Sequence, residues 1–442
     1  MKIKPAKYLQ GTINLPGDKS ISHRAALFSA LATGETKIEN FASSEDCRST
    51  LNCLKDLGVE ILRENSTVFI KGVGKNGFSK PEKELDCGNS GTTVRLISGI
   101  LAGQAFDSTL FGDESLSKRP MKRVIEPLSQ MNAKIESNEN LLPMKIHGRN
   151  PLKAITYKMP VASAQVKSCI LLAGLNADGI TKVRSPKSKV QSATSRNHTE
   201  LMLKYLGASI EEKFIETDES FIHEVAIDGN SKLIAKDLNV PSDISSAAFF
   251  LVGAACLENS ELLLQNVGLN PTRAAVIEVL QKFGAAIEIL DKREANGELV
   301  GNLRVIGKGS FTPNAGSNII SGEIIANLID EIPILAVFGT QLEGGLEIRN
   351  AEELRVKESD RIAATVENLR RMNADVEEFA DGLRVGKSNL KGAKIDSFGD
   401  HRIAMAFAVA ALLATGETEI INPECAAVSF PEFFACLAEV VK

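Results

Sequence analysis

The stretch SHRAALFSALATGETKIENF (22–41) returns near the C-terminus as HRIAMAFAVAALLATGETEIINP (401–423). Within it, LATGETKIEN (31–40) and LATGETEIIN (413–422) match at nearly every position, which chance does not explain. Each copy predicts a helix of small and apolar residues, then a glycine and a short strand. Because the helix is apolar on nearly all sides, we expect it to be buried. The fold is therefore built from repeated units around buried helices.

Six copies of this element occur along the chain. The other four are GTTVRLISGILAG (91–103), SAQVKSCILLAGLNADG (163–179), ISSAAFFLVGAACLENSELLLQNV (244–267) and IPILAVFGTQLEGGLEIRN (332–350). Each begins with, or directly follows, polar residues and passes through a turn into a strand-like run.

A shorter motif marks where the second helix of a copy ends. It occurs as LGVEI (57–61), MNAKIE (131–136), LGASIE (206–211), FGAAIE (283–288) and MNADVE (372–377). Its Gly or Asn recurs at steps of 74, 75, 77 and 89 residues, at positions 58, 132, 207, 284 and 373. Since Gly and Asn tolerate the left-handed conformation that ends many helices, each motif predicts a helix end followed by a strand.

A unit of two helices and several strands, repeated six times, predicts an α/β fold of two domains with three units each. The last unit lacks its final strands, and a short N-terminal strand would complete it. Both termini then lie in one domain, formed by residues 1–16 and 241–442, and residues 17–240 form an inserted central domain. The chain would cross between the domains near 16 and near 240.

The composition is that of a globular protein without a broad basic surface. Lys and Arg number 51 against 56 Asp and Glu, which gives a net charge of −5, and 43% of the 442 residues are hydrophobic. The longest apolar run, 403–414, is too short to span a bilayer, and the N-terminus MKIKPAKYLQ shows no signal peptide. We expect a cytoplasmic protein that binds neither membrane nor nucleic acid.

The seven cysteines are unevenly spaced and contain no Cys-x-x-Cys pair, and the five histidines form no ligand pattern with them. This pattern favours reduced, mostly buried thiols over a disulfide framework, and it predicts no metal site.

The starts of the buried helices carry the residues best suited to a function. They are GDKSISHR (17–24), CGNSGTTVR (87–95), ASAQVK (162–167), PSDISS (241–246), LIDEIP (328–333) and FGDHR (398–402). Helix starts present unpaired N–H groups, so they bind anions. For Ser242 and Asp243, a plain N-cap is at least as good an interpretation.

Three cations stand out among these starts: Lys19, Arg24 and Arg402. We place them in first helical turns, where a cation opposes the helix dipole and needs an anionic partner. An internal carboxylate such as Asp18 or Asp400 is one candidate. A bound ligand is the interpretation we favour, because the same arrangement recurs in separate repeats.

Two further segments concentrate charge. GDESLSKRPMKR (112–123) forms a loop that enters a helix, and its Lys122 and Arg123 are expected to be solvated. In ELRVKESDRIAATVENLRRM (353–372), Lys357 and Arg361 are four apart and are expected to share a helix face beside Glu358. An exposed ladder of salt bridges is an equally good interpretation of that segment.

The chain contains neither Gly-x4-Gly-Lys-Ser/Thr nor a Gly-x-Gly-x-x-Gly after a strand. These features together indicate an enzyme or a binding protein for phosphorylated or carboxylated metabolites, without identifying the reaction.

Several motifs, found in order from about residue 7 to about residue 436, resemble the 5-enolpyruvylshikimate-3-phosphate synthase family. They are LPGDKSISHRA (15–25), CGNSGTTVRL (87–96), SKRPM (117–121), ASAQVKS (162–168), LIDEIPILA (328–336), LRVKESDR (354–361) and GDHRIAM (399–405). The resemblance implies a two-domain inverted α/β barrel of six βαβαββ-type units. It also implies a monomer that needs no cofactor.

The resemblance implies transfer of the enolpyruvyl group of phosphoenolpyruvate to the 5-hydroxyl of shikimate 3-phosphate, with release of phosphate. The implied course is addition to C2 with protonation of C3, a tetrahedral intermediate, and elimination. Such an enzyme serves the shikimate pathway to chorismate and the aromatic amino acids.

The motifs also imply a set of site residues. Those for shikimate 3-phosphate are Ser20 and Arg24 at its carboxylate; Ser163, the Ala164 backbone, Arg196 and Lys357 at its phosphate; Gln165 and Asp330 at its ring; and Lys19. Those for phosphoenolpyruvate are Lys19, Asn89, Gly91, Arg119 and Gln165, with Arg361 and Arg402 as a clamp on its carboxylate. Guanidinium groups suit that clamp because they bind carboxylates in a bidentate manner.

The implied catalytic groups are Asp330, Glu358 and Lys19. The reaction needs a base for the 5-hydroxyl and an acid for the methylene carbon, and Asp330 and Glu358 fit those two tasks. Surrounding cations would keep Asp330 ionised, whereas Glu358 must be able to carry a proton. The sequence leaves open which group performs which step. An alternative interpretation is that Asp330 serves only as the N-cap of a helix at 332–340.

The chain departs from the family pattern at three places. Val428 stands where many members carry a Lys near the phosphate of phosphoenolpyruvate, Leu96 follows Arg95 where many have Pro, and SRNHTE (195–200) replaces a Ser/Tyr pattern. These features resemble a divergent bacterial subfamily that often tolerates glyphosate. Gly91 nevertheless remains where some tolerant members have Ala, so glyphosate sensitivity stays open.

Two alternative functions were considered. The UDP-N-acetylglucosamine enolpyruvyl transferases share the fold, but their loop cysteine has no counterpart in GDESLSKR (112–119), and Lys19 is followed by Ser20 instead of Asn. A non-catalytic repeat protein that binds anions is the other alternative. Such a protein gains nothing from carboxylates such as Asp330 and Glu358 among its cations.

Overall fold

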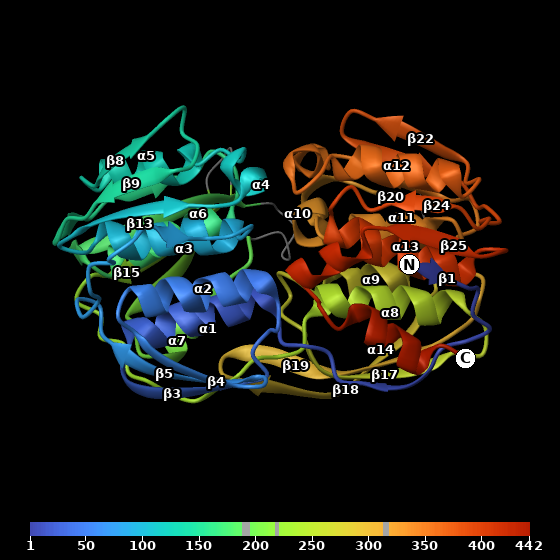
Figure 1. Cartoon of the computed structure of the whole chain (residues 1–442), viewed down its shortest axis with the longest axis horizontal. Helices are drawn as coiled ribbons and strands as arrows, with labels where there is room; N and C mark the ends of the chain where they lie inside the picture. Colours follow the sequence, from blue (N-terminus) through green and yellow to red (C-terminus); the bar gives the residue numbers. More distant parts are fainter. Residues whose placement is uncertain (188–194, 217–220, 313–317) are drawn as a thin grey trace. The chain divides into compact units, whose positions relative to one another are not determined.

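The computed structural model describes residues 1–187, 195–216, 221–312 and 318–442. The chain divides into two compact units (Figure 1). The central unit comprises Gly17–Val240 and Ala295–Glu298. The terminal unit, which contains both termini, comprises Met1–Pro16, Pro241–Glu294 and Leu299–Lys442. The interpretation of these units as the two domains expected from the sequence stays a prediction.

The first three copies of the repeat follow one another in the order strand, helix, strand, helix and two strands. The first comprises β2 (Gln10–Ile13), α1 (Lys19–Leu31), β3 (Thr33–Glu39), α2 (Glu45–Asp56), β4 (Glu60–Glu64) and β5 (Thr67–Val73). The second comprises β6 (Leu85–Asp86), α3 (Gly91–Ala102), β7 (Asp107–Phe111), α4 (Glu114–Ser117), α5 (Lys122–Gln130), β8 (Lys134–Ser137) and β9 (Met144–His147). The third comprises β10 (Leu152–Lys153), β11 (Thr156–Lys158), α6 (Ala164–Gly174), β12 (Ala177–Asp178), β13 (Ile180–Lys187), α7 (His198–Tyr205), β14 (Ile210–Glu216) and β15 (Phe221–Asp228).

The last three copies repeat this order, and β1 (Lys2–Ile3) precedes the whole series. The fourth comprises β16 (Leu238–Asn239), α8 (Ile244–Cys256), β17 (Glu261–Gly268), α9 (Ala275–Lys282), β18 (Ala286–Ala295) and β19 (Glu298–Ile306). The fifth comprises β20 (Ile319–Ile320), η1 (Gly322–Ile324), α10 (Ile325–Leu328), α11 (Ile332–Gly339), β21 (Leu346–Ile348), η2 (Glu352–Val356), α12 (Arg361–Arg371), β22 (Val376–Phe379) and β23 (Gly382–Val385). The sixth comprises β24 (Lys394–Asp396), α13 (His401–Leu413), β25 (Thr418–Ile421), η3 (Pro423–Val428) and α14 (Phe433–Val440).

The sheets share one pattern: a first strand lies parallel to the second, which pairs antiparallel with the fourth, and the third lies at the edge. Examples are β6-β7-β9-β8 and β20-β21-β23-β22. At the two crossovers the first strands of two copies are exchanged. β2, the first strand of the first copy, pairs with β17 of the fourth copy, and β16, the first strand of the fourth copy, pairs with β3 of the first. In the last sheet β1 takes the position of the fourth strand beside β25, with Lys2 opposite Glu419. The predicted completion of the last unit by an N-terminal strand is confirmed.

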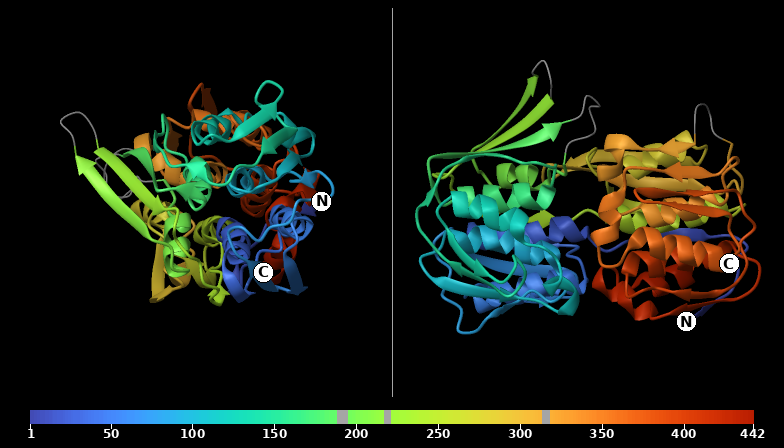
Figure 2. Two further views of the ribbon diagram at one scale, coloured as in Figure 1. Left: turned by 90° about the vertical axis from the view of Figure 1, so that its left-hand side faces the viewer. Right: turned by 90° about the horizontal axis from the view of Figure 1, so that it is seen from above.

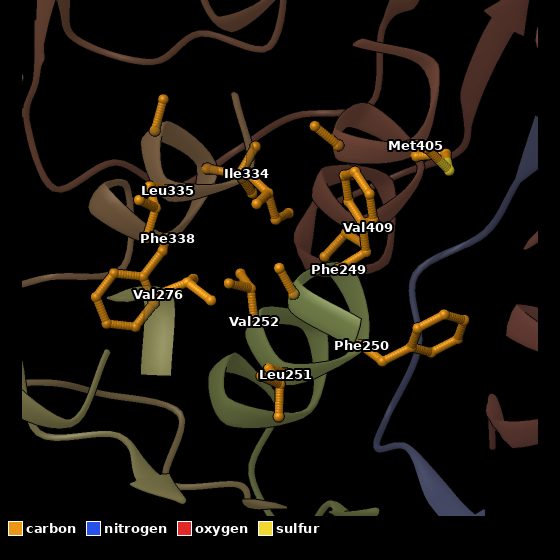
Figure 3. Packing of buried hydrophobic residues seen from close by; sticks show 14 of the residues in the cluster. Phe249, Phe250, Leu251, Val252, Val276, Ile334, Leu335, Phe338, Met405 and Val409 are labelled. Atoms are coloured by element: carbon orange, nitrogen blue, oxygen red, sulfur yellow. The ribbon is translucent and has the colours of Figure 1, made fainter. Parts of the chain in front are cut away.

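The first helix of each copy lies inside its own unit and is covered by strands (Figure 2). In the terminal unit α8, α11 and α13 contact one another, and all thirteen residues of α8 are buried. Figure 3 shows side chains from all three helices, among them Phe249, Ile334 and Met405, which belong to one buried cluster. Each such fully buried side chain contributes about 1.5–3 kcal/mol to folding. The predicted burial of the apolar helices is confirmed.

In the central unit α3 and α6 approach closely. A Cβ atom on Gly99 of α3 would lie 2.2 Å from the carbonyl oxygen of Cys169 in α6, so only glycine fits at this contact. The two helices therefore hold their N-terminal ends, which carry site residues, at a short and fixed separation.

The five motifs that predicted helix ends do end helices. Their Gly or Asn residues all have positive φ, and each donates its N–H to the carbonyl three residues back, as Gly58 does to Lys55 at 2.9 Å. The next residue donates to a carbonyl five residues back, as Val59 does to Leu54 at 3.0 Å. This pair of hydrogen bonds is the Schellman motif, and it satisfies backbone carbonyls that a helix end leaves without partners.

Candidate active site

Side chains cap five of the six buried helices at their starts. Asp18 caps α1, Ser90 caps α3, Ser163 caps α6, Asp243 caps α8 and Asp400 caps α13, each by accepting a backbone N–H bond. The N-cap interpretation of Asp243 is thus confirmed. In α11 the N-cap residue is Glu331, which makes no such bond. The alternative interpretation of Asp330 as the N-cap of this helix is therefore wrong, because Asp330 precedes that position.

We call the following residues of the central unit the central cluster. They are Lys19, Ser20, Arg24, Asn89, Gly91, Arg119, Ser163, Ala164, Gln165 and Arg196. We call the following residues of the terminal unit the terminal cluster. They are Asp330, Lys357, Glu358, Arg361 and Arg402.

Arg24 is a buried guanidinium that contacts neutral acceptors. Its Nε donates to Thr199 Oγ1 at 2.7 Å, its Nη1 to the Ser20 carbonyl at 2.8 Å, and its Nη2 to Ser168 Oγ at 2.9 Å. Burial lowers its pKa to about 10, whereas the charge of Glu200 raises it. Arg24 lies in the second turn of α1 and not in the first, so the prediction of its position was wrong by one turn. A buried cation with neutral partners is suited to bind an anion.

Lys19 begins α1 and pairs with a carboxylate from α2. Its Nζ lies 3.0 Å from Asp46 Oδ2, and both side chains are less than one fifth exposed. Asp46 belongs to α2, whose start contacts α3: Thr93 Oγ1 donates to the Asp46 carbonyl at 3.4 Å. The internal carboxylate considered for Lys19 therefore exists, but it comes from another helix.

Gln165, at the start of α6, is held by α3. Its Oε1 accepts from Arg95 Nη1 at 2.8 Å and its Nε2 donates to Thr92 Oγ1 at 3.1 Å. Gly91 leaves room for this arrangement, because a Cβ atom there would lie 2.8 Å from Arg95 Nη1 and 3.5 Å from Arg119 Nη1. Gly91 thus lies between two guanidinium groups, where a side chain would disturb both.

Arg119 lies between α4 and α5 and contacts the start of α3. Its Nη2 donates to Asn89 Oδ1 at 3.0 Å and to Ser115 Oγ at 3.2 Å. Lys122 and Arg123, farther along the same segment, are exposed, which confirms that they are solvated.

Three of the phosphate residues implied by the family motifs lie at the starts of α6 and α7, and the fourth, Lys357, lies between η2 and α12. Ser163 caps α6, Ala164 is its first residue, and Arg196 lies close enough to Arg24 for its charge to lower the pKa of that group. Ser195, next to Arg196, is held by buried Lys167, which bonds the Ser195 carbonyl at 3.3 Å and pairs with Glu200.

Arg361 is the centre of the terminal cluster. This 2% exposed guanidinium contacts Asp400 Oδ2 at 2.8 Å, Glu358 Oε2 at 2.6 Å and Asp330 Oδ1 at 3.4 Å. Burial would lower its pKa, but the three carboxylates raise it above the ordinary value. Arg361 thus stays charged and holds two of the implied catalytic carboxylates beside each other.

Arg402 differs from Arg361 in its surroundings. Its side chain is buried and lies over the ring of Phe249 at 6.0 Å, and in the described parts of the chain it makes no side-chain hydrogen bond or ion pair. Asp400, proposed as its internal partner, bonds the Arg402 backbone N–H at 2.8 Å and gives its other oxygen to Arg361. Arg402 is therefore a buried cation whose guanidinium has no carboxylate partner among the residues described.

Lys357 and Arg361 do not share a helix face, which corrects the prediction. The η2 segment ends at Val356, and α12 begins at Arg361 because Asp360 caps it by accepting from the Ala363 N–H at 3.0 Å. Lys357 instead pairs with Glu353 at 2.7 Å. The ladder interpretation is also wrong for Arg361, which is buried.

Sequence reasoning missed several partners that complete the two clusters. They are Asp46, Arg95, Ser168, Thr199, Arg273 and Glu331. Arg273 lies in the loop before α9 and contacts the start of α11. Its signal was weak, because a single Arg after Asn-Pro-Thr (270–272) looks like any loop cation.

In residues 1–187, 195–216, 221–312 and 318–442, no group of three or more His, Cys, Asp or Glu side chains is arranged to hold a metal ion. Within the same ranges, no helix combines the length and the apolar character that crossing a membrane requires.

Comparisons with known proteins agree over the whole chain. The EPSP synthase family model, described as 3-phosphoshikimate 1-carboxyvinyltransferase, matches residues 3–437. The 3-phosphoshikimate 1-carboxyvinyltransferases of Solibacter usitatus and Pelotomaculum thermopropionicum are 47% and 49% identical, and each comparison covers 100% of this chain and 99% of the relative. The solved structure of EPSP synthase from Acinetobacter baumannii is similar with a TM-score of 0.86 and 39% identity, covering 100% of this chain and 98% of that one.

The protein therefore belongs to the EPSP synthase family, the enzymes that transfer the enolpyruvyl group of phosphoenolpyruvate to shikimate 3-phosphate in aromatic amino-acid biosynthesis.

Proposed function

We propose that the two clusters divide the work of enolpyruvyl transfer to the 5-hydroxyl of shikimate 3-phosphate. In this proposal the central cluster holds the anionic groups of shikimate 3-phosphate and the phosphate of phosphoenolpyruvate. The terminal cluster holds the carboxylate of phosphoenolpyruvate and moves the protons. The observation that carries the proposal is Arg361, a buried anion-binding side chain that also contacts Asp330 and Glu358.

For shikimate 3-phosphate, Ser20 and Arg24 would bind the carboxylate. The neutral partners of Arg24 support this role, because a ligand carboxylate meets no competing ion pair there. Ser163, the Ala164 N–H and Arg196 would bind the phosphate, since the start of α6 adds backbone donors to the charge of Arg196. Gln165 would contact the ring, and Lys357 would assist at the phosphate.

For phosphoenolpyruvate, Lys19, Asn89, Gly91, Arg119 and Gln165 would surround the phosphate. Arg361 and Arg402 would bind the carboxylate, and the buried guanidinium of Arg402 offers donors that the described residues leave unused. What replaces the Lys that many family members carry near Val428 stays open.

In the chemical step, Asp330 would take the proton of the 5-hydroxyl while the hydroxyl oxygen attacks C2 of phosphoenolpyruvate. Glu358 would protonate C3, which gives a tetrahedral intermediate. Return of a C3 proton to the Glu358 carboxylate, with cleavage of the bond between C2 and the phosphate oxygen, would release phosphate and complete the transfer. Lys19 would assist proton transfer.

Arg361 favours the ionised form of Glu358 in the empty protein, because their atoms lie 2.6 Å apart. A phosphoenolpyruvate carboxylate that competes for Arg361 would weaken this pairing and let Glu358 accept a proton. On this proposal, substrate binding itself prepares the acid.

The first test replaces Asp330 by Ala and measures phosphate release from phosphoenolpyruvate and shikimate 3-phosphate. We expect a loss of kcat of at least about a hundredfold, which is the lower end of general base catalysis. Turnover close to that of the unchanged protein, with an intact thermal transition, would remove Asp330 from the role of base.

The second test compares shikimate 3-phosphate with UDP-N-acetylglucosamine as the acceptor. Phosphate release only with shikimate 3-phosphate is expected, and release with the UDP-sugar would favour the alternative transferase. The monomeric state and the cytoplasmic location stay predictions.

A further inference from the structure

Arg273 is a buried charged residue that the proposed mechanism does not use. It lies in the loop between β17 and α9, and its side chain is 4% exposed. Its Nη1 contacts Glu331 Oε1 at 3.0 Å and Oε2 at 3.2 Å, and its Nη2 donates to Ser245 Oγ. Arg273 therefore joins the loop to the starts of two buried helices, α8 and α11.

The same guanidinium also faces Asp330. Arg273 Nη2 lies 3.7 Å from Asp330 Oδ2, while Arg361 Nη1 lies 3.4 Å from Asp330 Oδ1. Each carboxylate oxygen of Asp330 thus faces a different arginine. Arg361 comes from α12 and Arg273 from the loop before α9, so the carboxylate is fixed from two sides.

The loop holds Arg273 in a preformed position. Asn270 Oδ1 accepts from the Thr272 N–H at 2.9 Å and from Thr272 Oγ1 at 2.7 Å, and the Asn270 carbonyl accepts from the Arg273 N–H at 2.8 Å. An Asx turn of this kind orders the backbone before any ligand binds. The Arg273 side chain, which follows this turn, therefore loses little conformational entropy when it contacts the terminal cluster.

Neutralising Glu331 does not by itself account for this position. Both carboxylate oxygens of Glu331 contact Nη1 alone, whereas Nη2 contacts Ser245 Oγ and faces Asp330 Oδ2. We propose that Arg273 is a positioning residue for the transfer reaction, which orients the Asp330 carboxylate and keeps it ionised for removal of the 5-hydroxyl proton. This inference rests on the proposed role of Asp330 as the base.

Charged groups reach Asp330 directly or through its two arginines. They are Arg273 from the loop before α9, Glu331 at the start of α11, Glu358 and Arg361 at the start of α12, and Asp400 at the start of α13. Three of these five are carboxylates, which oppose the ionisation of Asp330, so the loss of either arginine should matter.

The test uses a double variant, Arg273→Gln with Glu331→Gln, because it removes a buried pair without leaving one charge alone. We expect kcat to fall about tenfold. Loss of Arg273 alone would raise the apparent pKa of the acidic limb of kcat by about one unit, the low end of the effect of a nearby opposite charge. In the double variant this pKa should rise by less than that, because loss of the Glu331 charge acts in the opposite direction. The matched control is Arg304→Gln with Glu261→Gln, an exposed pair on β19 and β17, for which both quantities should stay unchanged. If the Arg273 and Glu331 double variant keeps the kcat and the acidic limb of the unchanged enzyme, Arg273 serves only to neutralise Glu331 and the proposal is wrong.

A double-mutant cycle separates this inference from the proposed function. In an Asp330→Asn background the double variant should cause no further loss of kcat, since the group through which Arg273 acts is gone. A further tenfold loss there would overturn the role of Arg273 while leaving Asp330 as the base. Unchanged turnover of Asp330→Asn alone would instead overturn the proposed function.

Arg273→Lys covers the case in which the double variant does not fold. This variant keeps the positive charge, so the apparent pKa of the acidic limb should not change. A single ammonium group, however, cannot make the contacts that the planar guanidinium makes through two nitrogens. We expect kcat to fall about threefold to tenfold, and an unchanged kcat would count against positioning.

Discussion

Two arginines that we assign to the same carboxylate should affect stability in opposite directions. Arg361 is surrounded by three carboxylates, whereas Arg402 is buried without a carboxylate partner for its guanidinium among the described residues. Both are replaced by Met, which has a similar length and no charge. Arg402→Met should stabilise the ligand-free protein, and Arg361→Met should destabilise it.

The magnitudes follow from the partners. An unpaired buried charge costs several kcal/mol, so after partial relaxation Arg402→Met should gain about 1–2 kcal/mol. Removing Arg361 leaves Asp400, Glu358 and Asp330 facing one another, which should cost about 3–5 kcal/mol. For a unit of this size, 1 kcal/mol changes the melting temperature by about 2–4 °C. The two variants should therefore melt on opposite sides of the unchanged protein.

Both variants should lose affinity for phosphoenolpyruvate if they form the proposed clamp. Losing one charge-assisted contact costs about 2–3 kcal/mol, so the KM for phosphoenolpyruvate should rise by a factor of about 30 to 150. If Arg402→Met is both more stable and less active than the unchanged protein, Arg402 binds the ligand and does not stabilise the fold.

The measurements are thermal unfolding by circular dichroism without ligand, urea unfolding, and steady-state kinetics with phosphoenolpyruvate varied. Arg371→Met is the control, because Arg371, in the same helix as Arg361, makes only exposed contacts among the described residues, a pair with Glu367 and a long bond of 3.5 Å to the Lys394 carbonyl. Its melting temperature should stay within about 1–2 °C. A clear destabilisation by Arg402→Met would refute the reasoning, because it would mean that a stabilising partner balances this charge.

Three further predictions concern single contacts. Gly91→Ala should raise the KM for phosphoenolpyruvate about tenfold in steady-state kinetics, because the new Cβ atom would displace Arg95, whose Nη1 lies 2.8 Å from that position. Lys75→Met should lower the free energy of unfolding by urea by about 1.5–3 kcal/mol, since the ammonium bonds two backbone carbonyls at 2.8 and 2.6 Å. Asn132→Ala should cost about 1 kcal/mol in the same assay because of a φ of 69°, whereas Asn132→Gly should stay within about 0.5 kcal/mol.

Much of the fold could be predicted because its signals are local. Gly58 and Asn373 mark helix ends through a backbone conformation that few residue types adopt, and the buried helices are visible in composition alone. The exchange of first strands at the crossovers was beyond this reasoning. Strands such as β16, with two residues, are too short for an alternating pattern, and their partners are set by hydrogen bonds to a distant copy.

The sequence was sufficient to identify the cations at helix starts as candidate site residues, but not to identify the residues that pair with them. Lys19 was identified from its place at a helix start, but its partner Asp46 lies in the next helix, and no spacing rule relates the two. The error at Lys357 has a different cause. Four-residue spacing suggested a shared helix, although the Asp360 cap starts the helix only at Arg361.

The repeat explains where the anion-binding groups lie, but the chemistry of the two clusters comes from what contacts each arginine. Arg24 bonds two hydroxyls and a carbonyl, so an anion that binds it displaces no ion pair. An anion that binds Arg361 must compete with three carboxylates. In the proposed mechanism, equivalent helix starts therefore form two kinds of site, one at which an anion displaces no ion pair and one at which an anion would change the charge state of its neighbours. Proton transfer needs the second kind, because only there does the arrival of a substrate alter a carboxylate.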